Sequence, residues 1–267
     1  MLERLIVRAG EAACLDKRDP ADRLGLEGKR EVEPLRSELH GRLRDLQERL
    51  WAEATRSVLL VLQGLDTSGK DGTIDHVFAG VNPQGIAGAA FKAPSEAELA
   101  HDYLWRIHTA CPSRGEIGIF NRSHYEDLVT VRVLGLVSPD ECRRRFRHTR
   151  AFERMLTDEG TTVVKVFLHI SKEEQAKRLR ARLADPAKRW KFRRSDLDTR
   201  KRWDDYMTAY EEAISKTTTK WGPWYVVPAD RKWVRNLAVA RLLVDILELL
   251  DPRFPEPRED LSGVTIE

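Results

Sequence analysis

The chain has 267 residues, of which 41% are apolar, so it is long enough to bury a sizeable core within one large domain. Its 46 basic and 43 acidic residues give a formal charge of +3, which indicates no particular class of partner. The scattered cysteines, without CxxC spacing, argue against a disulfide framework or a zinc site. No apolar run approaches the roughly 20 residues of a membrane span, and the charged N-terminus is not typical of a secretory signal. We therefore expect a cytoplasmic protein without a membrane partner.

In chain order, we predict an N-terminal arm and helix over residues 1–54, a main domain over 55–250 and a C-terminal tail over 251–267. The first thirty residues carry no clear periodicity and are predicted as an irregular arm. From Pro34 onward, leucines recur every three or four residues, at Leu35, Leu39, Leu43, Leu46 and Leu50. This spacing predicts a helix to about Glu53 with its leucines along one side.

Beyond this helix, short apolar runs alternate with helical stretches. The runs predicted as strands are Val58 to Leu62, Ala89 to Phe91, Ile117 to Phe120, Thr162 to Ile170 and Trp224 to Val227. Helix starts with capping-box spacing occur at Ser95 with Glu98, Ser138 with Glu141 and Ser171 with Glu174, and a last helix is predicted near Val234 to Leu250. The alternation predicts an α/β fold: a mostly parallel sheet between helices, with ligands at the carboxyl ends of its strands.

A glycine-rich loop follows the first predicted strand, and the spacing of Gly64, Gly69 and Lys70 matches GxxxxGK. In such a loop, backbone N–H groups surround a phosphate, the following helix adds its dipole, and the lysine adds a point charge. A chance match in an ordinary turn is the alternative, but the position after a buried strand favours a phosphate site. The predicted phosphate-binding residues are Gly64, Ser68, Gly69, Lys70, Gly72 and Thr73.

Two residues of this loop depart from nucleotide-hydrolysing P-loops. Asp71 stands where those loops have a Ser or Thr that holds magnesium. Asp66 lies inside the loop, where bound phosphates would repel its carboxylate unless a divalent cation sat between them. We therefore assign Asp66 to magnesium, to orienting the acceptor phosphate, or to both. The alternative is a turn aspartate that hydrogen-bonds its own backbone.

A second polar cluster follows the strand at Ile117 to Phe120 and reads NRSHYED. Arg122 is suited to stabilising a transferring phosphoryl group through charge-assisted hydrogen bonds. Glu126 or Asp127 could hold a metal or contact the acceptor, although acidic residues at a helix N-terminus also serve as ordinary caps. His124 has no partner at metal-ligand spacing, and we interpret it as structural.

Positive charge is concentrated between Lys177 and Arg202, where twelve Lys or Arg residues accompany three Asp. A proline and dense charge interrupt helical periodicity here. A mobile basic flap over a phosphate loop delivers positive charge to the transferring group and keeps water out. We predict such a lid at about 178–203. A solvated basic face, or a nucleic-acid surface using Trp190 and Phe192, is the alternative.

Taken together, these segments resemble polyphosphate kinase family 2. The stretch VLQGLDTSGKDGTIDHVFAGVNPQG resembles the variant phosphate loop of that family, FNRSHYEDL its second motif, and RLADPAKRWKF with WYVVPADRKW its lid and final strand. The matching segments extend from about Leu59 to Asn236. Asn-Arg-Ser followed by Glu126-Asp127 resembles the subgroup often called class III, which accepts both nucleoside mono- and diphosphates.

The resemblance implies a P-loop kinase fold similar to thymidylate kinase, with a basic helical lid. It implies reversible transfer of phosphoryl groups from inorganic polyphosphate to AMP or ADP. The implied metal is magnesium, with manganese as the possible substitute. The implied quaternary state is a homodimer or homotetramer, to whose interface the leucine stripe could contribute. It implies that Asp66 and Lys70 are the catalytic pair of the loop, that Asn121 and Arg122 lie near the nucleotide phosphates, and that Arg178 and Arg182 belong to the lid. Together with the reasoning on the polar cluster, the predicted catalytic residues are Asp66, Lys70, Arg122, Glu126 and Asp127. Asp66 and Asp127 are the candidate metal ligands, and the candidate nucleotide-binding residues are Asn121, Arg122, Asp127, Arg178 and Arg182.

Two other functions remain open at this stage. An ATP-dependent nucleoside monophosphate kinase would share the loop, sheet and lid, but the missing Ser or Thr after Lys70 counts against it. A non-catalytic module that binds RNA or polyphosphate is disfavoured because carboxylates around an anion site would weaken binding. We therefore expect no nucleic-acid partner.

Overall fold

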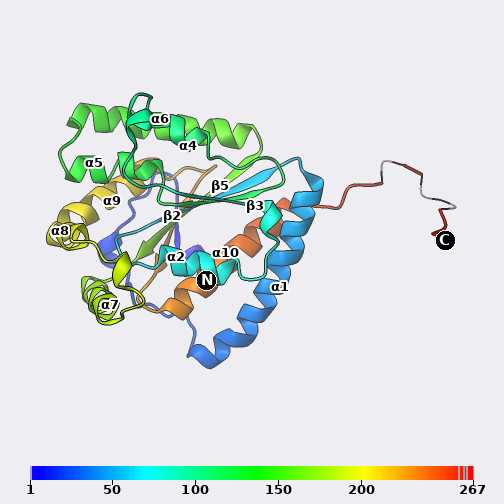
Figure 1. Ribbon diagram of the computed structural model, residues 1–267, viewed down its shortest axis with the longest axis horizontal. Coiled ribbons are helices and arrows are strands. Elements are labelled where there is room, and N and C mark those ends of the chain that lie inside the picture. The colour runs from blue at the N-terminus through cyan, green and yellow to red at the C-terminus, as the bar shows by residue number, and fades with distance from the viewer. Residues whose placement is uncertain (1, 258, 261, 263, 267) are drawn as a thin grey trace.

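The structure is a computed structural model that describes residues 2–257, 259–260, 262 and 264–266. In this part of the chain, six strands form one sheet in the order β1-β6-β5-β2-β4-β3. Figure 1 labels β2, β3 and β5 within the sheet. The strands are β1 (Ile6–Val7), β2 (Ser57–Gln63), β3 (Ile86–Ala90), β4 (Ile117–Asn121), β5 (Thr161–His169) and β6 (Trp224–Pro228). β1 pairs antiparallel with β6, and the other neighbouring strands are parallel, so the predicted α/β architecture is confirmed.

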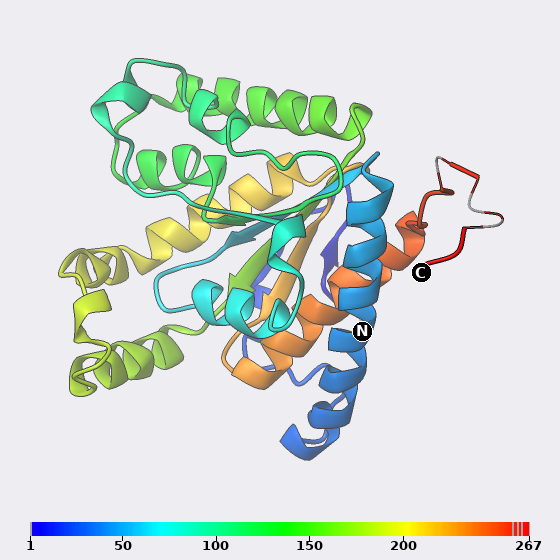
Figure 2. The ribbon, with the colours of Figure 1, turned by 45° about the vertical axis from the view of Figure 1, so that its right-hand side comes forward.

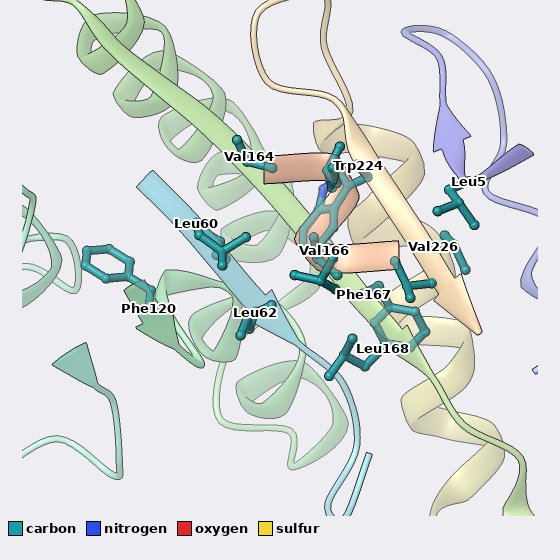
Figure 3. Packing of buried hydrophobic residues seen from close by; sticks show 14 of the residues in the cluster. Leu5, Leu60, Leu62, Phe120, Val164, Val166, Phe167, Leu168, Trp224 and Val226 are labelled. Carbon is teal, nitrogen blue, oxygen red and sulfur yellow. The ribbon is translucent and has the colours of Figure 1, made fainter. Parts of the chain in front are cut away.

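β2 lies in the middle of the sheet between β4 and β5, and all of its residues are buried. Leu60 pairs with Ile119 of β4 on one side and with Val164 of β5 on the other. Figure 3 shows Leu60 and Leu62 beside the apolar side chains of β5. Helices cover both faces of a parallel sheet, which explains why this strand is a continuous apolar run rather than an alternating one.

The helices alternate with the strands along the chain. They are α1 (Lys29–Glu53), α2 (Lys70–Val77), α3 (Glu96–Leu99), α4 (Trp105–His108), α5 (Thr130–Val133), α6 (Pro139–Asp158), α7 (Lys172–Ala184), α8 (Ser195–Lys201), α9 (Trp203–Thr217) and α10 (Lys232–Leu250). Short 3-10 helices are η1 (Leu2–Arg4), η2 (Leu15–Lys17), η3 (Pro83–Gly85), η4 (His124–Asp127) and η5 (Arg189–Lys191). α6 and α9 pack on one side of the sheet, and α2, α10 and α1 pack on the other (Figures 1 and 2).

The predicted helix starts at Ser95, Ser138 and Ser171 are confirmed. Each of these serine side chains accepts a hydrogen bond from the backbone N–H three residues later, as N-caps do. β3 begins three residues earlier than predicted, because its small residues, Gly88 among them, give little apolar signal. No helix of the described residues is long and apolar enough to cross a membrane.

The N-terminal segment belongs to the same hydrophobic core as the rest of the chain. α1 packs against α10, and Leu39, Leu43 and Leu50 are buried there. Leu39, Leu43 and Leu50 are therefore covered within their own chain, whereas Leu35 and Leu46 are only partly buried. The expectation that this leucine stripe could serve an interface between subunits stays a prediction. The arm is also fixed in place, since the Glu211 carboxylate accepts hydrogen bonds from the N–H groups of Cys14 and Leu15, both at 2.8 Å.

Candidate active site

The predicted phosphate loop joins the carboxyl end of β2 to the N-terminus of α2. Gly64 and Gly69 both have positive φ, at 147° and 106°, which side chains rarely adopt. A Cβ atom on Gly64 would also lie 2.7 Å from Ser68 Oγ and 2.8 Å from the Leu168 carbonyl oxygen. The sharp turn of the loop therefore requires glycine at these positions.

Lys70 is the first residue of α2, and its ammonium group turns back into the loop. Nζ donates to the carbonyl oxygens of Gly64 at 2.7 Å and Leu65 at 3.4 Å. Burial, with a smaller contribution from the nearby Arg122 guanidinium, lowers the pKa of Lys70 to about 8. The loop therefore holds a desolvated cation, which interacts more strongly with a phosphoryl group than an ammonium in water does.

Arg235 of α10 lies against the outside of the loop, and sequence reasoning did not single it out. Its Nη1 donates to the Ser68 carbonyl oxygen at 3.1 Å. A Cβ atom on Gly69 would lie only 1.7 Å from Arg235 Nη1, and a Cβ atom on Gly72 would lie 3.4 Å from Arg235 Nη2. Burial lowers the pKa of Arg235 to about 10. Gly69 and Gly72 thus leave room for a second cation beside the start of α2.

Asp66, Arg122 and Glu126 lie together between the loop and the end of β4. Arg122 Nη2 donates to Asp66 Oδ1 at 2.6 Å, and Nη1 lies 3.4 Å from Glu126 Oε2. Arg122 has φ of 64°, an unusual value for a non-glycine residue, at the point where the chain leaves β4. The two carboxylates raise the pKa of Arg122 well above its usual range despite partial burial.

The two departures from the usual P-loop pattern are hydrogen-bonded to each other. Asn121 Nδ2 donates to Asp71 Oδ1 at 2.6 Å. An amide at the end of β4 thus partners a carboxylate at the start of α2, in the region where ordinary P-loops combine an aspartate with a Ser or Thr hydroxyl around magnesium. The contact pairs the two departures with each other, and it links β4 to α2.

Asp127 is not part of the Asp66 cluster. Its carboxylate lies 3.4 Å from Arg106 Nη2 and 3.8 Å from Arg145 Nη1. Burial raises the pKa of Asp127, and the two guanidinium groups partly oppose that effect. Arg106 and Arg145 come from α4 and α6, outside the sequence motifs, and only the long-range packing identifies them.

A buried polar network supports η4 from beneath. The Glu153 carboxylate accepts hydrogen bonds from Tyr125 Oη at 2.6 Å and Lys165 Nζ at 2.6 Å, and its Oε1 lies 3.3 Å from His124 Nε2. Lys165 Nζ also donates to the Thr217 carbonyl oxygen at 2.8 Å. These contacts are consistent with a structural role for His124, and they tie η4 to α6, β5 and the end of α9.

The predicted lid consists of the end of α7, η5 and α8, which project beyond the sheet in Figure 1. All five N–H groups of Arg178 are engaged, by the carbonyl oxygens of Thr67, Ser68, Ala229 and Asp230 and by the Glu174 carboxylate. Arg178 is therefore hydrogen-bonded to the phosphate loop in this structure and has no N–H group left to donate to a nucleotide. Arg182 Nη1 lies 3.3 Å from the Lys191 carbonyl oxygen and 3.4 Å from Asp196 Oδ2, within the lid itself.

The carboxylates fit a magnesium ion that is completed by substrate. Among the described residues there is no group of three or more His, Cys, Asp or Glu side chains placed to hold a metal alone. Magnesium, however, is commonly held by one or two carboxylates together with substrate phosphates and water. Asp66 offers such a carboxylate on the phosphate loop itself. Asp66 and Asp127 both stay predictions as ligands, because each carboxylate lies beside arginine, Asp66 at 2.6 Å from Arg122 and Asp127 between Arg106 and Arg145.

Comparison with known proteins shows what these features resemble. The family model described as polyphosphate kinase 2 matches residues 27–255. A protein of Meiothermus ruber named AMP/ADP-polyphosphate phosphotransferase is 52% identical over 255 residues, which are 95% of each chain. A protein of Rhodopseudomonas palustris named ADP-polyphosphate phosphotransferase is 45% identical over 227 residues, covering 80% of this chain and 78% of its own. The crystal structure of polyphosphate kinase 2 from Arthrobacter aurescens superimposes with a TM-score of 0.93 at 44% identity, covering 98% and 93% of the two chains.

Proposed function

The chain belongs to the polyphosphate kinase 2 family, and from this membership we infer that it transfers phosphoryl groups from inorganic polyphosphate to AMP and ADP. The observation that carries the inference is Asp66, a carboxylate inside a phosphate loop and 2.6 Å from Arg122. Asp71 occupies the position at which ATP-hydrolysing loops have Ser or Thr, and its carboxylate accepts a hydrogen bond from the Asn121 side chain. Both features count against the ATP-dependent alternative.

In the proposed mechanism, the loop N–H groups and Lys70 bind the donor polyphosphate. Lys70 and Arg122 then stabilise the negative charge of the transferring phosphoryl group from two sides, since phosphoryl transfer depends mainly on positioning and charge stabilisation. Magnesium, held by Asp66 and substrate phosphates, would neutralise charge between donor and acceptor. Asn121 and Arg122, with Asp127, form the proposed acceptor side. Transfer is reversible because a phosphoanhydride bond is broken and another is formed.

The lid has a proposed role in closing the site. Arg182 is the candidate for contacting the nucleotide, since its bonds in the lid are long, at 3.3 and 3.4 Å. For Arg178 to contact a nucleotide, the bonds to the loop carbonyls would have to break first. We therefore propose that Arg178 acts mainly on the donor side, through the shape of the phosphate loop.

Purified protein incubated with AMP, magnesium and either long-chain polyphosphate or ATP tests the assignment. Polyphosphate should produce ADP and then ATP, whereas ATP as sole donor should produce little ADP from AMP. Turnover with ATP alone, and none with polyphosphate, would support the nucleoside monophosphate kinase instead. Omitting magnesium, or replacing it with manganese, in the same assay tests the metal requirement.

The quaternary state and location are also proposals. We propose a homodimer or homotetramer, in line with the family resemblance, that works in the cytoplasm without a nucleic-acid partner. Leu39, Leu43 and Leu50 of α1 are buried within their own chain, so a contact through this helix would use its partly exposed residues, such as Leu35 and Leu46. Sedimentation equilibrium of the purified protein measures the state directly.

A further inference from the structure

The outward side of α6 carries a line of four arginines that the proposed reaction does not use. Arg143, Arg147, Arg150 and Arg154 follow one another at intervals of four, three and four residues, so they lie along one side of the helix, and all four are exposed. At 1.5 Å per residue the line is roughly 16 Å long. We call these residues the α6 arginine stripe. In Figure 1, α6 lies along the edge of the molecule, away from α1 and α10.

The middle of the stripe lacks acidic partners. Arg143 pairs with Asp140, and Arg154 pairs with Asp158, at the two ends. Neither Arg147 nor Arg150 forms an ion pair with any residue that the structure describes. Like charges at helical spacing repel one another, so the stripe presents positive charge that the folded chain leaves unbalanced.

A shallow hollow lies beside this unbalanced charge. Its volume is about 270 Å³, and it is lined by Arg147, Arg150, Ala151, Arg154 and Trp221. The Trp221 indole Nε1 is buried and has no hydrogen-bond partner among the described residues. Because Nε1 is buried, the polar groups that the hollow presents are the guanidinium groups of Arg147, Arg150 and Arg154, and no carboxylate is among the lining residues. Such a lining suits an anion and disfavours a cation.

The stripe is on the opposite side of α6 from the proposed active site. Arg145, which faces inward, donates to the Asp127 carbonyl oxygen at 3.0 Å. A helix with its side chains is about 10–12 Å across. The hollow also lies beside Trp221, which precedes β6 and so is near the amino ends of the parallel strands, whereas the phosphate loop is at their carboxyl ends. An anion in the active site can thus reach the hollow only if it is long enough to continue around the helix and along the length of the strands, which a nucleotide is not.

We propose that the α6 arginine stripe is an exosite that binds the part of a long polyphosphate chain extending beyond the active site. The proposal rests on the polyphosphate-dependent function inferred above. Polyphosphate fits better than RNA because the aromatic ring at the hollow is covered: the Arg154 guanidinium lies 5.0 Å from the centre of the Trp221 ring. Single-stranded RNA binding relies on accessible aromatic faces on which bases stack, whereas polyphosphate has no bases. Two linked contacts raise the apparent affinity of a polymer without changing the chemistry of transfer.

The test compares wild type with the double variant Arg147→Gln and Arg150→Gln, using AMP as acceptor. KM is measured for long-chain polyphosphate and for the shortest chain that the wild-type enzyme uses. The variant should raise KM for the long chain about tenfold and lower the slope of log affinity against log salt by about 1.5. The kcat, KM for the short chain and KM for AMP should stay unchanged. Free magnesium is held constant, because polyphosphate binds it.

A matched control is the double variant Arg30→Gln and Arg44→Gln on α1. Both arginines are exposed, and neither forms an ion pair with a described residue. This control removes the same charge and should leave KM for the long chain unchanged. Equal effects of the two double variants would mean that net charge, not the stripe, attracts the polymer, and would overturn the proposal.

Other results would also overturn it. An unchanged KM for the long chain in the double variant, or an equal rise in KM for the short chain, would each do so. So would a change in oligomeric mass on substitution, or RNA binding to the stripe that polyphosphate does not displace. Wild-type turnover with polyphosphate is measured in the same series. Its absence would refute the proposed function, whereas normal wild-type turnover with an unaltered variant would refute the exosite alone.

Discussion

Replacing Arg178 with Met separates a loop-holding arginine from one that binds the nucleotide. The guanidinium donates to the carbonyl oxygens of Thr67 and Ser68 in the phosphate loop, at 3.0 Å each, and to those of Ala229 and Asp230 after β6, at 2.6 and 3.0 Å. Methionine keeps much of the apolar stem and removes every donor. The variant therefore leaves four carbonyl oxygens without this partner.

The cost follows from how much water can replace the lost donors. The side chain of Arg178 is 11% exposed, so some of the carbonyl oxygens become hydrated in the variant and others stay buried. A buried polar group left unpaired costs about 1–3 kcal/mol, and a lost hydrogen bond that water replaces costs about 1 kcal/mol. The Ser68 carbonyl oxygen keeps its hydrogen bond from Arg235, so three carbonyl oxygens bear this cost. At about 1 kcal/mol or more each, we expect a loss of at least about 3 kcal/mol in the free energy of unfolding, which lowers Tm by about 6–12 °C or more for a domain of this size.

Thermal unfolding and steady-state kinetics together decide between the two roles. Arg178→Met should lower Tm and raise KM for polyphosphate about tenfold, because the loop N–H groups lose their fixed geometry, while KM for AMP changes little. Arg180→Met is the control, since Arg180 lies exposed on the same helix, and it should leave both quantities unaltered. An unchanged Tm with a large rise in KM for AMP would refute the loop-holding role.

Four further predictions concern the groups around the loop and the polar network beneath η4. Asp66→Asn should abolish most transfer with little change in Tm, since it removes charge but keeps size; an active variant would favour an ordinary turn aspartate. Lys70→Ala should lower kcat at least about a hundredfold. Burial lowers the pKa of Lys70 to about 8, so wild-type kcat/KM should fall as pH rises through about 8. Between about pH 8 and the unfolded pKa of this group, the unfolded chain holds more protons than the folded chain, so the contribution of Lys70 to the free energy of unfolding rises with pH. A flat profile of kcat/KM against pH would contradict this. Tyr125→Phe, which removes the donor to Glu153, should lower kcat about tenfold or more without a matching rise in KM for AMP; a loss of Tm alone would indicate a purely structural network.

The sequence alone determined the features that depend on local spacing. The phosphate loop was predictable because a buried strand, two glycines and Lys70 are consecutive in the chain, and helix N-caps were predictable because serine bonds an N–H only three residues away. The alternation of apolar runs and helices was enough for the sheet class. Asp66 could be named as a site residue because it is a carboxylate inside the GxxxxGK loop, and Arg122 because it directly follows a strand whose carboxyl end opens into the site.

Only the tertiary structure decided which distant side chains meet these groups. Arg235 is 167 residues from Ser68 in sequence, and no local pattern indicates that its guanidinium donates to the Ser68 carbonyl. The basic residues of α7 likewise carry the same charge whether they face a nucleotide or a loop carbonyl, so their composition predicted a lid without predicting that Arg178 would hold the phosphate loop. The leucine stripe of α1 shows the same limit: periodicity identifies an apolar side of a helix, but whether α10 or another subunit covers that side depends on the packing of the whole chain.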